Sequence, residues 1–103
     1  MSTYLVTRHK GAAEWVLSNA AKYSVEIDRV IPHLDIELLI PGDVVVGTLP
    51  IQMVALLTEL GVGYVHLSLT VTMDIRGMEL TCEEMYRRDA RLERFKVCRD
   101  EPE

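Results

Sequence analysis

The sequence predicts an α/β protein with three layers, in which helices cover both faces of a mainly parallel sheet. Strand-like and helix-like segments alternate along the chain in the order strand, helix, strand, strand, helix, strand, helix. The run Val44-Val45-Val46 is continuously β-branched, which is typical of a strand that is buried on both faces. Right-handed crossovers would then place the carboxyl ends of the parallel strands at one edge of the sheet.

The first half of the chain contributes two strands and one helix. Residues 3–7 are Tyr-Leu-Val flanked by threonines, which is too short for a helix and rich in strand formers. The alanine-rich pattern of residues 11–22 predicts a helix. Apolar residues alternate over residues 25–30, which predicts a second strand. Residues 35–40, bracketed by prolines, fit either one turn of helix or a short extended piece.

The second half begins with the buried strand at 44–46, followed by a helix over residues 51–60. Pro50 precedes this helix and Gly61 follows it, which is the usual asymmetry of helix ends. Residues 63–69 predict another strand, which residues 70–72 could extend.

A last helix is predicted to begin at Thr81 and to end near Phe95. Thr81-Cys82-Glu83-Glu84 matches a capping box, and Met85, Leu92 and Phe95 would share its apolar side. Its arginines would then form a solvated face with ion pairs, or alternatively a surface for a partner.

Composition indicates one domain, residues 1–103, that is soluble and cytoplasmic. The chain is 49% hydrophobic and 26% charged, which suits a single compact core. No apolar run approaches the roughly 18 residues of a membrane span, and no secretion signal opens the chain. Two cysteines, Cys82 and Cys98, are too few for a disulfide framework and favour a reducing compartment.

The net charge of −5 argues against binding to long nucleic acids, because that affinity comes from neutralising phosphates. A negative net charge is nevertheless compatible with a small anionic ligand that is held by a local cluster of donors. Six of the eleven Lys and Arg residues lie between residues 87 and 99, so cations are sparse elsewhere.

Potential anion-binding residues gather where the predicted strands end, which is the edge where open α/β sheets bind ligands. Three potential cations precede the first helix, and a Gly-Thr turn precedes the second. We predict a phosphate-type site there, although each group alone could be an ordinary solvated or capping turn. The residues at these ends are Thr7, Arg8, His9, Lys10, Gly11, Gly47, Thr48, Leu49, Pro50, Ser68, Thr70 and Thr72.

Three other residues have two interpretations each. His33 follows the second strand and is either a surface histidine or part of the same edge. His66 lies in mid-strand on the face opposite Val65 and Leu67, where a hydrogen-bonded core histidine is favoured over a ligand. Arg76 lies in the loop before the last helix and could close over a ligand or cap carbonyl groups.

Several familiar chemistries have no motif in this sequence. Dinucleotide-binding and P-loop glycine patterns and the Gly-x-Ser-x-Gly elbow are absent. No histidine pair has zinc spacing, and no acidic cluster suggests magnesium. Cys82, near a predicted helix start, is better explained as structural. We therefore expect no metal and no cofactor.

Five segments together resemble a known family. They are Thr-Tyr-Leu-Val-Thr-Arg-His-x-Gly-Ala-x-Glu-Trp from residue 3, His-Leu-Asp from residue 33, residues 42–50, Tyr-x-His-Leu from residue 64, and Arg-Gly-x-Glu-Leu from residue 76. Over residues 3–92 the chain resembles the small, single-domain CRISPR-associated proteins of type III loci, the Csx group, whose fold is a minimal CARF-like (Rossmann-like) domain.

This resemblance implies a stand-alone domain that recognises a cyclic oligoadenylate second messenger, with cyclic tetra-adenylate as the expected ring. Such domains work as homodimers, with the ring across the two-fold axis over the carboxyl ends of the strands. Members of the class are ring nucleases, which open the ring and switch off antiviral signalling. Some relatives mainly sequester it, so a non-catalytic binding protein or sponge is the first alternative.

The predicted site residues suit metal-independent cleavage, in which a ribose 2′-OH attacks the adjacent phosphate and leaves a 2′,3′-cyclic phosphate. We assign catalysis to Arg8 as a bidentate phosphate ligand, His9 as general acid or base, and Thr48 as a hydroxyl donor. The predicted ligand-binding residues are Thr7, Lys10, Gly11, Gly47, Leu49, Ser68 and Arg76. A second alternative is a small histidine-phosphatase-like phosphohydrolase, because Arg8-His9 ends a first strand, although Lys10 interrupts that motif.

Overall fold

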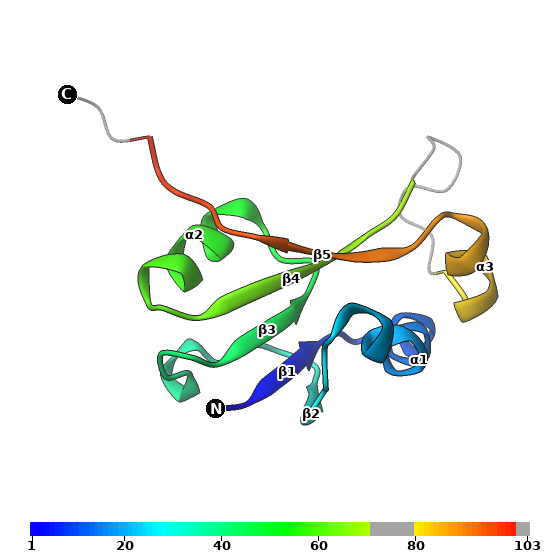
Figure 1. Cartoon of the computed structure of the whole chain (residues 1–103), viewed down its shortest axis with the longest axis horizontal. Coiled ribbons are helices and arrows are strands. Elements are labelled where there is room, and N and C mark those ends of the chain that lie inside the picture. The colour runs from blue at the N-terminus through cyan, green and yellow to red at the C-terminus, as the bar shows by residue number, and fades with distance from the viewer. Residues whose placement is uncertain (71–79, 101–103) are drawn as a thin grey trace.

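A computed structural model describes residues 1–70 and 80–100, which form one five-stranded sheet in the order β2-β1-β3-β4-β5 (Figure 1). The strands β2, β1, β3 and β4 are mutually parallel, and β5 runs antiparallel to β4 at the edge. The predicted α/β class with a mainly parallel sheet is therefore confirmed. The strands are β1 (Thr3–Val6), β2 (Arg29–Ile31), β3 (Val44–Gly47), β4 (Gly63–Ser68) and β5 (Arg91–Phe95).

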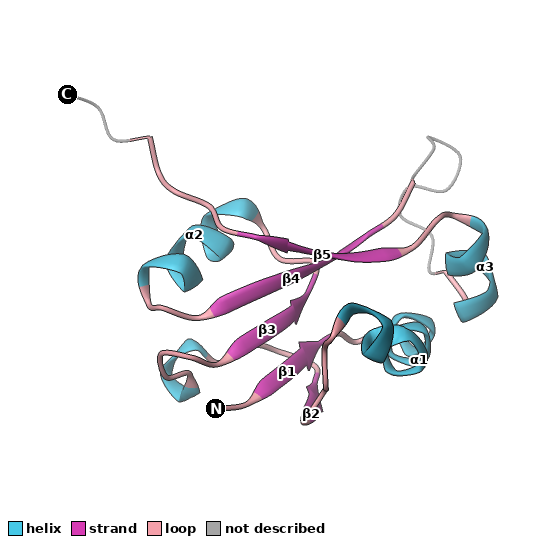
Figure 2. Cartoon of the chain, viewed as in Figure 1, coloured by secondary structure: helices cyan, strands magenta, loops and turns pink. Residues whose placement is uncertain are grey.

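Helices leave the sheet in two directions, and Figure 2 shows α1 and α3 beside each other, well separated from α2. The helix after β1 returns to β2, whereas the helix after β3 returns to β4 on the other side of β3. With right-handed crossovers, the two helices must cover opposite faces of the sheet. The helical elements are α1 (Lys10–Asn19), the 3-10 turns η1 (Ala20–Tyr23) and η2 (Ile36–Leu38), α2 (Ile51–Glu59) and α3 (Cys82–Arg87).

The sheet separates two cores, and alternation along β3 supplies both. Val46 belongs to the larger core under α1 and α3, together with Leu5 and Trp15. Val45 faces the other way and packs with Leu57 of α2. Both valines are fully buried, which explains the unbroken β-branched run that the sequence shows.

The second strand is shorter than its alternating pattern predicts. Ser24 takes a left-handed conformation after η1, and Val25 bonds back to the carbonyl of Ala20, so this valine closes the helical segment instead of opening a strand. Ile27 packs against the same core from a loop. Within this segment, the residues that pair with β1 as a strand are 29–31. The prediction of a strand over 25–30 was therefore wrong at its beginning.

Two further local predictions have a clear outcome. Residues 36–38 form a 3-10 turn capped by Asp35, whose side chain accepts from the amide of Glu37, so the helical alternative for 35–40 is correct. The amide of Thr70 bonds to the carbonyl of Arg88 beyond the end of β4. Residues 71 and 72, which could have extended that strand, lie outside the described residues.

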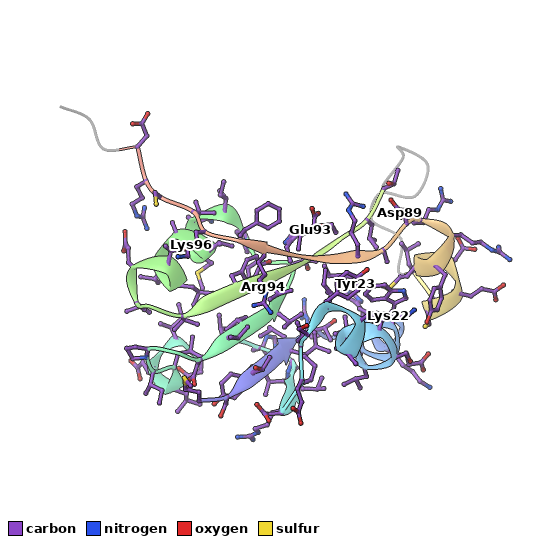
Figure 3. The ribbon with its side chains drawn as sticks, in the orientation of Figure 1. Lys22, Tyr23, Asp89, Glu93, Arg94 and Lys96 are labelled. Atoms are coloured by element: carbon purple, nitrogen blue, oxygen red, sulfur yellow. The ribbon has the colours of Figure 1, made fainter. Side chains whose placement is uncertain are left out.

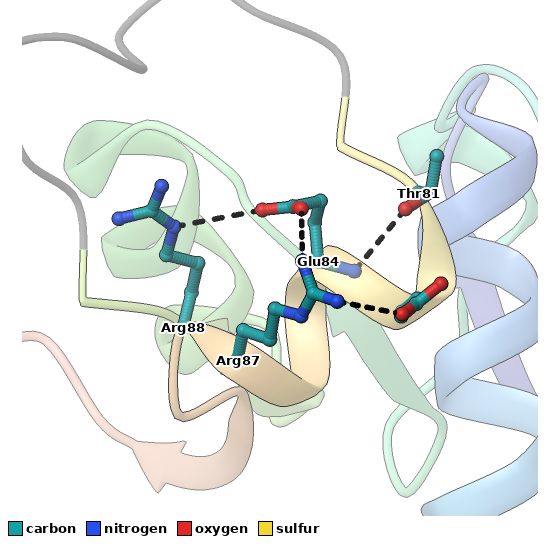
Figure 4. A network of polar contacts seen from close by, with 5 residues as sticks. Thr81, Glu84, Arg87 and Arg88 are labelled. Atoms are coloured by element: carbon teal, nitrogen blue, oxygen red, sulfur yellow. Dashed lines mark hydrogen bonds and ion pairs between the residues drawn. The ribbon is translucent and has the colours of Figure 1, made fainter.

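The prediction of a long last helix was wrong beyond its first turns. Thr81 caps the helix as expected, with its hydroxyl accepting from the Glu84 amide at 3.1 Å (Figure 4). The helix then ends at Arg87, and Asp89 turns the chain with a φ of 57°. Leu92 is buried opposite Leu67 in the antiparallel ladder, so sheet pairing replaces the apolar helix face.

The cations of this segment are consequently divided between a short helix and an edge strand. Arg87 pairs with Glu83 at 2.8 Å and with Glu84 at 3.2 Å, all on α3 (Figure 4). On β5, Glu93 and Arg94 leave the strand on opposite sides (Figure 3). Charges on both sides of an exposed edge strand discourage unwanted pairing with other strands.

The buried carboxylate of Asp43 generates a stability prediction. It accepts from the amides of Ile40 (3.0 Å) and Ser2 (2.8 Å), and these bonds lower its pKa. The ionised form therefore stabilises the fold above about pH 4, and the contribution disappears as the pH falls through the lowered pKa. We expect Asp43→Asn to melt at a lower temperature at pH 7 and to lose less further stability in acid than the wild type.

Thermal melts between pH 2 and pH 7 measure this difference. Asp35→Asn is the matched control, because asparagine caps a helical turn about as well as aspartate. Parallel melting curves for Asp43→Asn and the wild type across this range would contradict the assignment.

Candidate functional site

A cavity of about 320 Å³ opens at the carboxyl ends of β1, β3 and β4, on the α1 and α3 side of the sheet. It lies at the switch point between β1 and β3, from which the two following helices leave in opposite directions. This is the edge at which the sequence predicts a ligand. The described residues that line it are Leu5, Val6, Thr7, His9, Ala12, Gly47, Thr48, Leu67, Leu69, Leu80 and Met85.

Four predicted site residues meet in this cavity: Thr7, His9, Gly47 and Thr48. His9 is the N-cap residue of α1 and has an extended backbone, while its amide donates to the Thr7 hydroxyl at 3.1 Å. This short turn carries the chain from the end of β1 into the helix. The residues from the first and third strand ends, separated by about 40 positions in the sequence, are thus brought to one rim.

The predicted cations Arg8 and Lys10 lie beside the cavity rather than in its wall. Both are exposed and border a shallow depression that Thr7, His9 and Pro32 also line. Lys10 approaches Glu14 at 4.0 Å in a largely exposed pair, and Arg8 forms no ion pair with any residue in the described ranges. Two positive side chains are therefore available to an anion at the rim.

The walls of the cavity are apolar, which the sequence-based prediction of an anion site missed. Leu67 and Leu69 face it from the end of β4, and Ala12 and Met85 face it from the two helices. The signal was present in the alternation of β4, because Leu67 and Leu69 share the face of Val65. Among the described lining residues none carries a carboxylate.

Gly11 and Gly47 are required by close backbone packing. A Cβ on Gly11 would overlap the carbonyl oxygen of Leu80, which places the first turn of α1 directly against the segment that precedes α3. A Cβ on Gly47 would lie 3.0 Å from the carbonyl oxygen of Val6. Gly47 lines the cavity, whereas Gly11 lines a neighbouring depression with Lys10 and Thr81.

Besides Lys10 and Gly11, which line a neighbouring depression, the predicted ligand-binding residues Leu49 and Ser68 are not brought to the cavity. Leu49 packs against the core under α2. Ser68 shares the sheet face of Tyr64 and His66, opposite the cavity, and does not line it. Arg76 lies outside the described residues, so its predicted role stays a prediction.

A buried polar cluster lies behind the third strand end. The Tyr64 hydroxyl accepts from the amide of Leu49 at 2.9 Å, donates to the carbonyl of Gly47 at 2.9 Å and contacts Nδ1 of His66 at 2.7 Å. Burial raises the pKa of Tyr64 and lowers that of His66, against an opposing effect of Glu93 on His66. The expectation of a hydrogen-bonded His66 facing away from Val65 is confirmed.

His33 and the two cysteines lie away from the cavity. His33 is exposed and borders a separate cavity of about 120 Å³ beside Tyr4 and Asp35. Cys82 is the half-buried first residue of α3, and Cys98 is exposed near the chain end; neither forms a disulfide.

Within residues 1–70 and 80–100, no group of three or more His, Cys, Asp or Glu side chains could hold a metal ion. In the same part of the chain, no helix has both the length and the apolar character needed to cross a bilayer.

The sheet order, with a cavity at its switch point, defines a Rossmann-like α/β protein. Within that class, the chain belongs to the family described as "Putative CRISPR-associated protein (Cas_VVA1548)", whose model matches residues 4–98. No curated protein and no solved structure gives a significant match. The predicted relationship to small CRISPR-associated proteins is therefore confirmed.

The packing of Gly11 generates a second stability prediction. Alanine normally favours a helix by about 1 kcal/mol over glycine. At this position the overlap with Leu80 should reverse the sign, so we expect Gly11→Ala to reduce the free energy of unfolding by about 1–3 kcal/mol. Urea denaturation measures the change, with Ser18→Ala on the exposed side of α1 as a near-neutral control. A stabilised Gly11→Ala variant would show that the helix does not pack as described.

Proposed function

We propose that this protein is a metal-independent ring nuclease that binds and cleaves a cyclic oligoadenylate, with cyclic tetra-adenylate as the expected ring. The observation that carries the proposal is the cavity at the β1/β3 switch point, with apolar walls, a rim of hydroxyl and imidazole groups, and two exposed cations beside it. Membership of a CRISPR-associated family supports the biological setting.

The cavity suits one nucleotide unit of such a ring. Its volume of about 320 Å³ is at the lower end of the range of about 300–1,000 Å³ for small-molecule sites. Apolar walls formed by Leu67, Leu69 and Met85 favour a nucleobase, which has large faces with little need for hydrogen bonds. The rim residues Thr7 and Thr48 then suit the ribose and phosphate, since both carry hydroxyl groups.

The proposed chemical step uses Arg8, His9 and Thr48, which lie at the cavity or beside it. The ribose 2′-oxygen attacks the adjacent phosphorus, the bond from phosphorus to the 5′-oxygen breaks, and a 2′,3′-cyclic phosphate remains. The 2′-OH loses a proton and the leaving 5′-oxygen gains one, and His9 suits either transfer because histidine exchanges protons near neutral pH. Arg8 and the Thr48 hydroxyl would stabilise the extra negative charge of the transition state.

A homodimer would extend the site. A ring that lies across a two-fold axis over the strand ends meets each donor twice, so two copies of Arg8 and Lys10 would face it. This arrangement provides a local positive surface on a protein whose net charge is −5.

A sponge that binds the ring without cleaving it is the second candidate. The observation that favours it is the predominantly apolar lining. Among the described residues of this lining, His9 alone has an ionisable side chain. Such a lining supports affinity more directly than catalysis.

Incubation of the purified protein with cyclic tetra-adenylate in EDTA tests the proposal. We expect linear adenylates that end in 2′,3′-cyclic phosphate, resolved by chromatography and identified by mass. An intact ring that elutes with the protein would establish the sponge. A ring that is neither cleaved nor bound would overturn both candidates.

Variants at the rim test the assignment of catalytic residues. General acid or base catalysis typically contributes about 10²–10⁴ in rate, so His9→Ala should reduce kcat by at least about a hundredfold and change KM little. Arg8→Ala should reduce kcat/KM in the same direction. His33→Ala, on an exposed loop beside a different cavity, is the matched histidine control and should retain turnover. Equal loss of affinity and turnover in His9→Ala would remove that residue from catalysis.

A further inference from the structure

We propose that Tyr64 is a positioning residue that holds Thr48 at the cavity rim, an inference that rests on the proposed function. Thr48 lies between the last residue of β3 and the beginning of α2, where the chain crosses from the sheet to the helix on the opposite face. Thr48 lines the cavity, and its neighbours Gly47 and Leu49 both bond to one oxygen atom of Tyr64.

The directions of these bonds follow from the groups involved. The Leu49 amide can only donate and the Gly47 carbonyl can only accept, so the single hydroxyl proton of Tyr64 points to Gly47. All three contacts are satisfied when His66 carries a proton on Nδ1 and donates it to the same oxygen. In that tautomer, His66 leaves the hydroxyl proton of Tyr64 to the Gly47 carbonyl.

The oxygen is well placed to act as a rigid clamp. Tyr64 is 4% exposed, and its ring packs in the core under α2 with Val45 and Leu57. His66 is held in turn by an edge contact with Phe95, with ring centroids 5.9 Å apart. Because the Tyr64 hydroxyl bonds to the backbone on both sides of Thr48, this clamp leaves the threonine little freedom to move relative to the rim.

Tyr64→Phe removes the hydroxyl and keeps the ring in its core. Because small displacements of a reacting group can reduce rates by up to about a hundredfold, we expect kcat on cyclic tetra-adenylate to fall at least about tenfold, with KM changed less than about threefold. The Leu49 amide should also exchange its hydrogen faster, as measured by NMR. His66→Phe, which keeps a ring against Phe95, should lower kcat in the same direction by a smaller factor.

Thr58→Val is the matched control. The Thr58 hydroxyl donates to the carbonyl of Val54 at 3.0 Å and accepts from the amide of Val97 at 3.2 Å, so its loss also removes two partly buried bonds on the α2 side. Neither of these two bonds of the Thr58 hydroxyl involves residues 47–49. This variant should match Tyr64→Phe in lost stability and keep wild-type kcat and Leu49 exchange.

The outcomes separate the two proposals. If the wild type does not cleave the ring, the proposed nuclease fails, and the clamp is judged by Leu49 exchange and by the affinity for uncleaved cyclic tetra-adenylate. Faster exchange with weaker binding in Tyr64→Phe alone would then support it. Unchanged Leu49 exchange in Tyr64→Phe, or an equal fall of kcat in Thr58→Val, would overturn the positioning role.

Discussion

The parallel pairing of β1 with β3 is the constraint on which the rest of the structure depends. Leu5 pairs with Val46 in this ladder, and the helices that follow the two strands leave for opposite faces. The carboxyl ends of β1 and β3 are therefore left uncovered by their own crossovers, and the cavity lies there. At the other end of β1, backbone amides bond to the carboxylates of Asp28 and Asp43, which ties the first strand into the centre of the sheet.

The cavity has its shape because α1 and α3 are held against one another. The Asn19 side chain donates to the Tyr86 hydroxyl at 2.8 Å, and the rings of Trp15 and Tyr86 lie 6.1 Å apart. At the opposite end of α1, Gly11 allows the chain before α3 to pack directly on the helix. Contacts at both ends of α1 thus place Met85 of α3 over the strand ends, where it completes an apolar wall.

The two faces of the sheet have different parts in the site. The cavity opens on the α1 face, whereas the polar cluster around Tyr64 lies on the α2 face. They meet at residues 47–49, where β3 ends and the chain crosses between the layers. An apolar wall and exposed cations beside the rim are compatible with an overall acidic protein, because each depends on local geometry and not on net charge.

The sequence by itself determined the elements whose signals are local. The β-branched run of β3, the proline and glycine at the ends of α2 and the capping box at Thr81 act within a few residues of themselves, and each was predicted correctly. The grouping of Thr7, His9 and Thr48 at one edge also followed from topology. Only tertiary structure decided that Leu92 belongs to a strand, because its partner Leu67 is 25 residues away and the local pattern fits a helix equally well. Contacts between distant segments also decide three features of the site: the apolar walls of the cavity, the position of Leu49 and Ser68 away from it, and the three bonds of the Tyr64 hydroxyl. A local sequence pattern carries no information about such contacts.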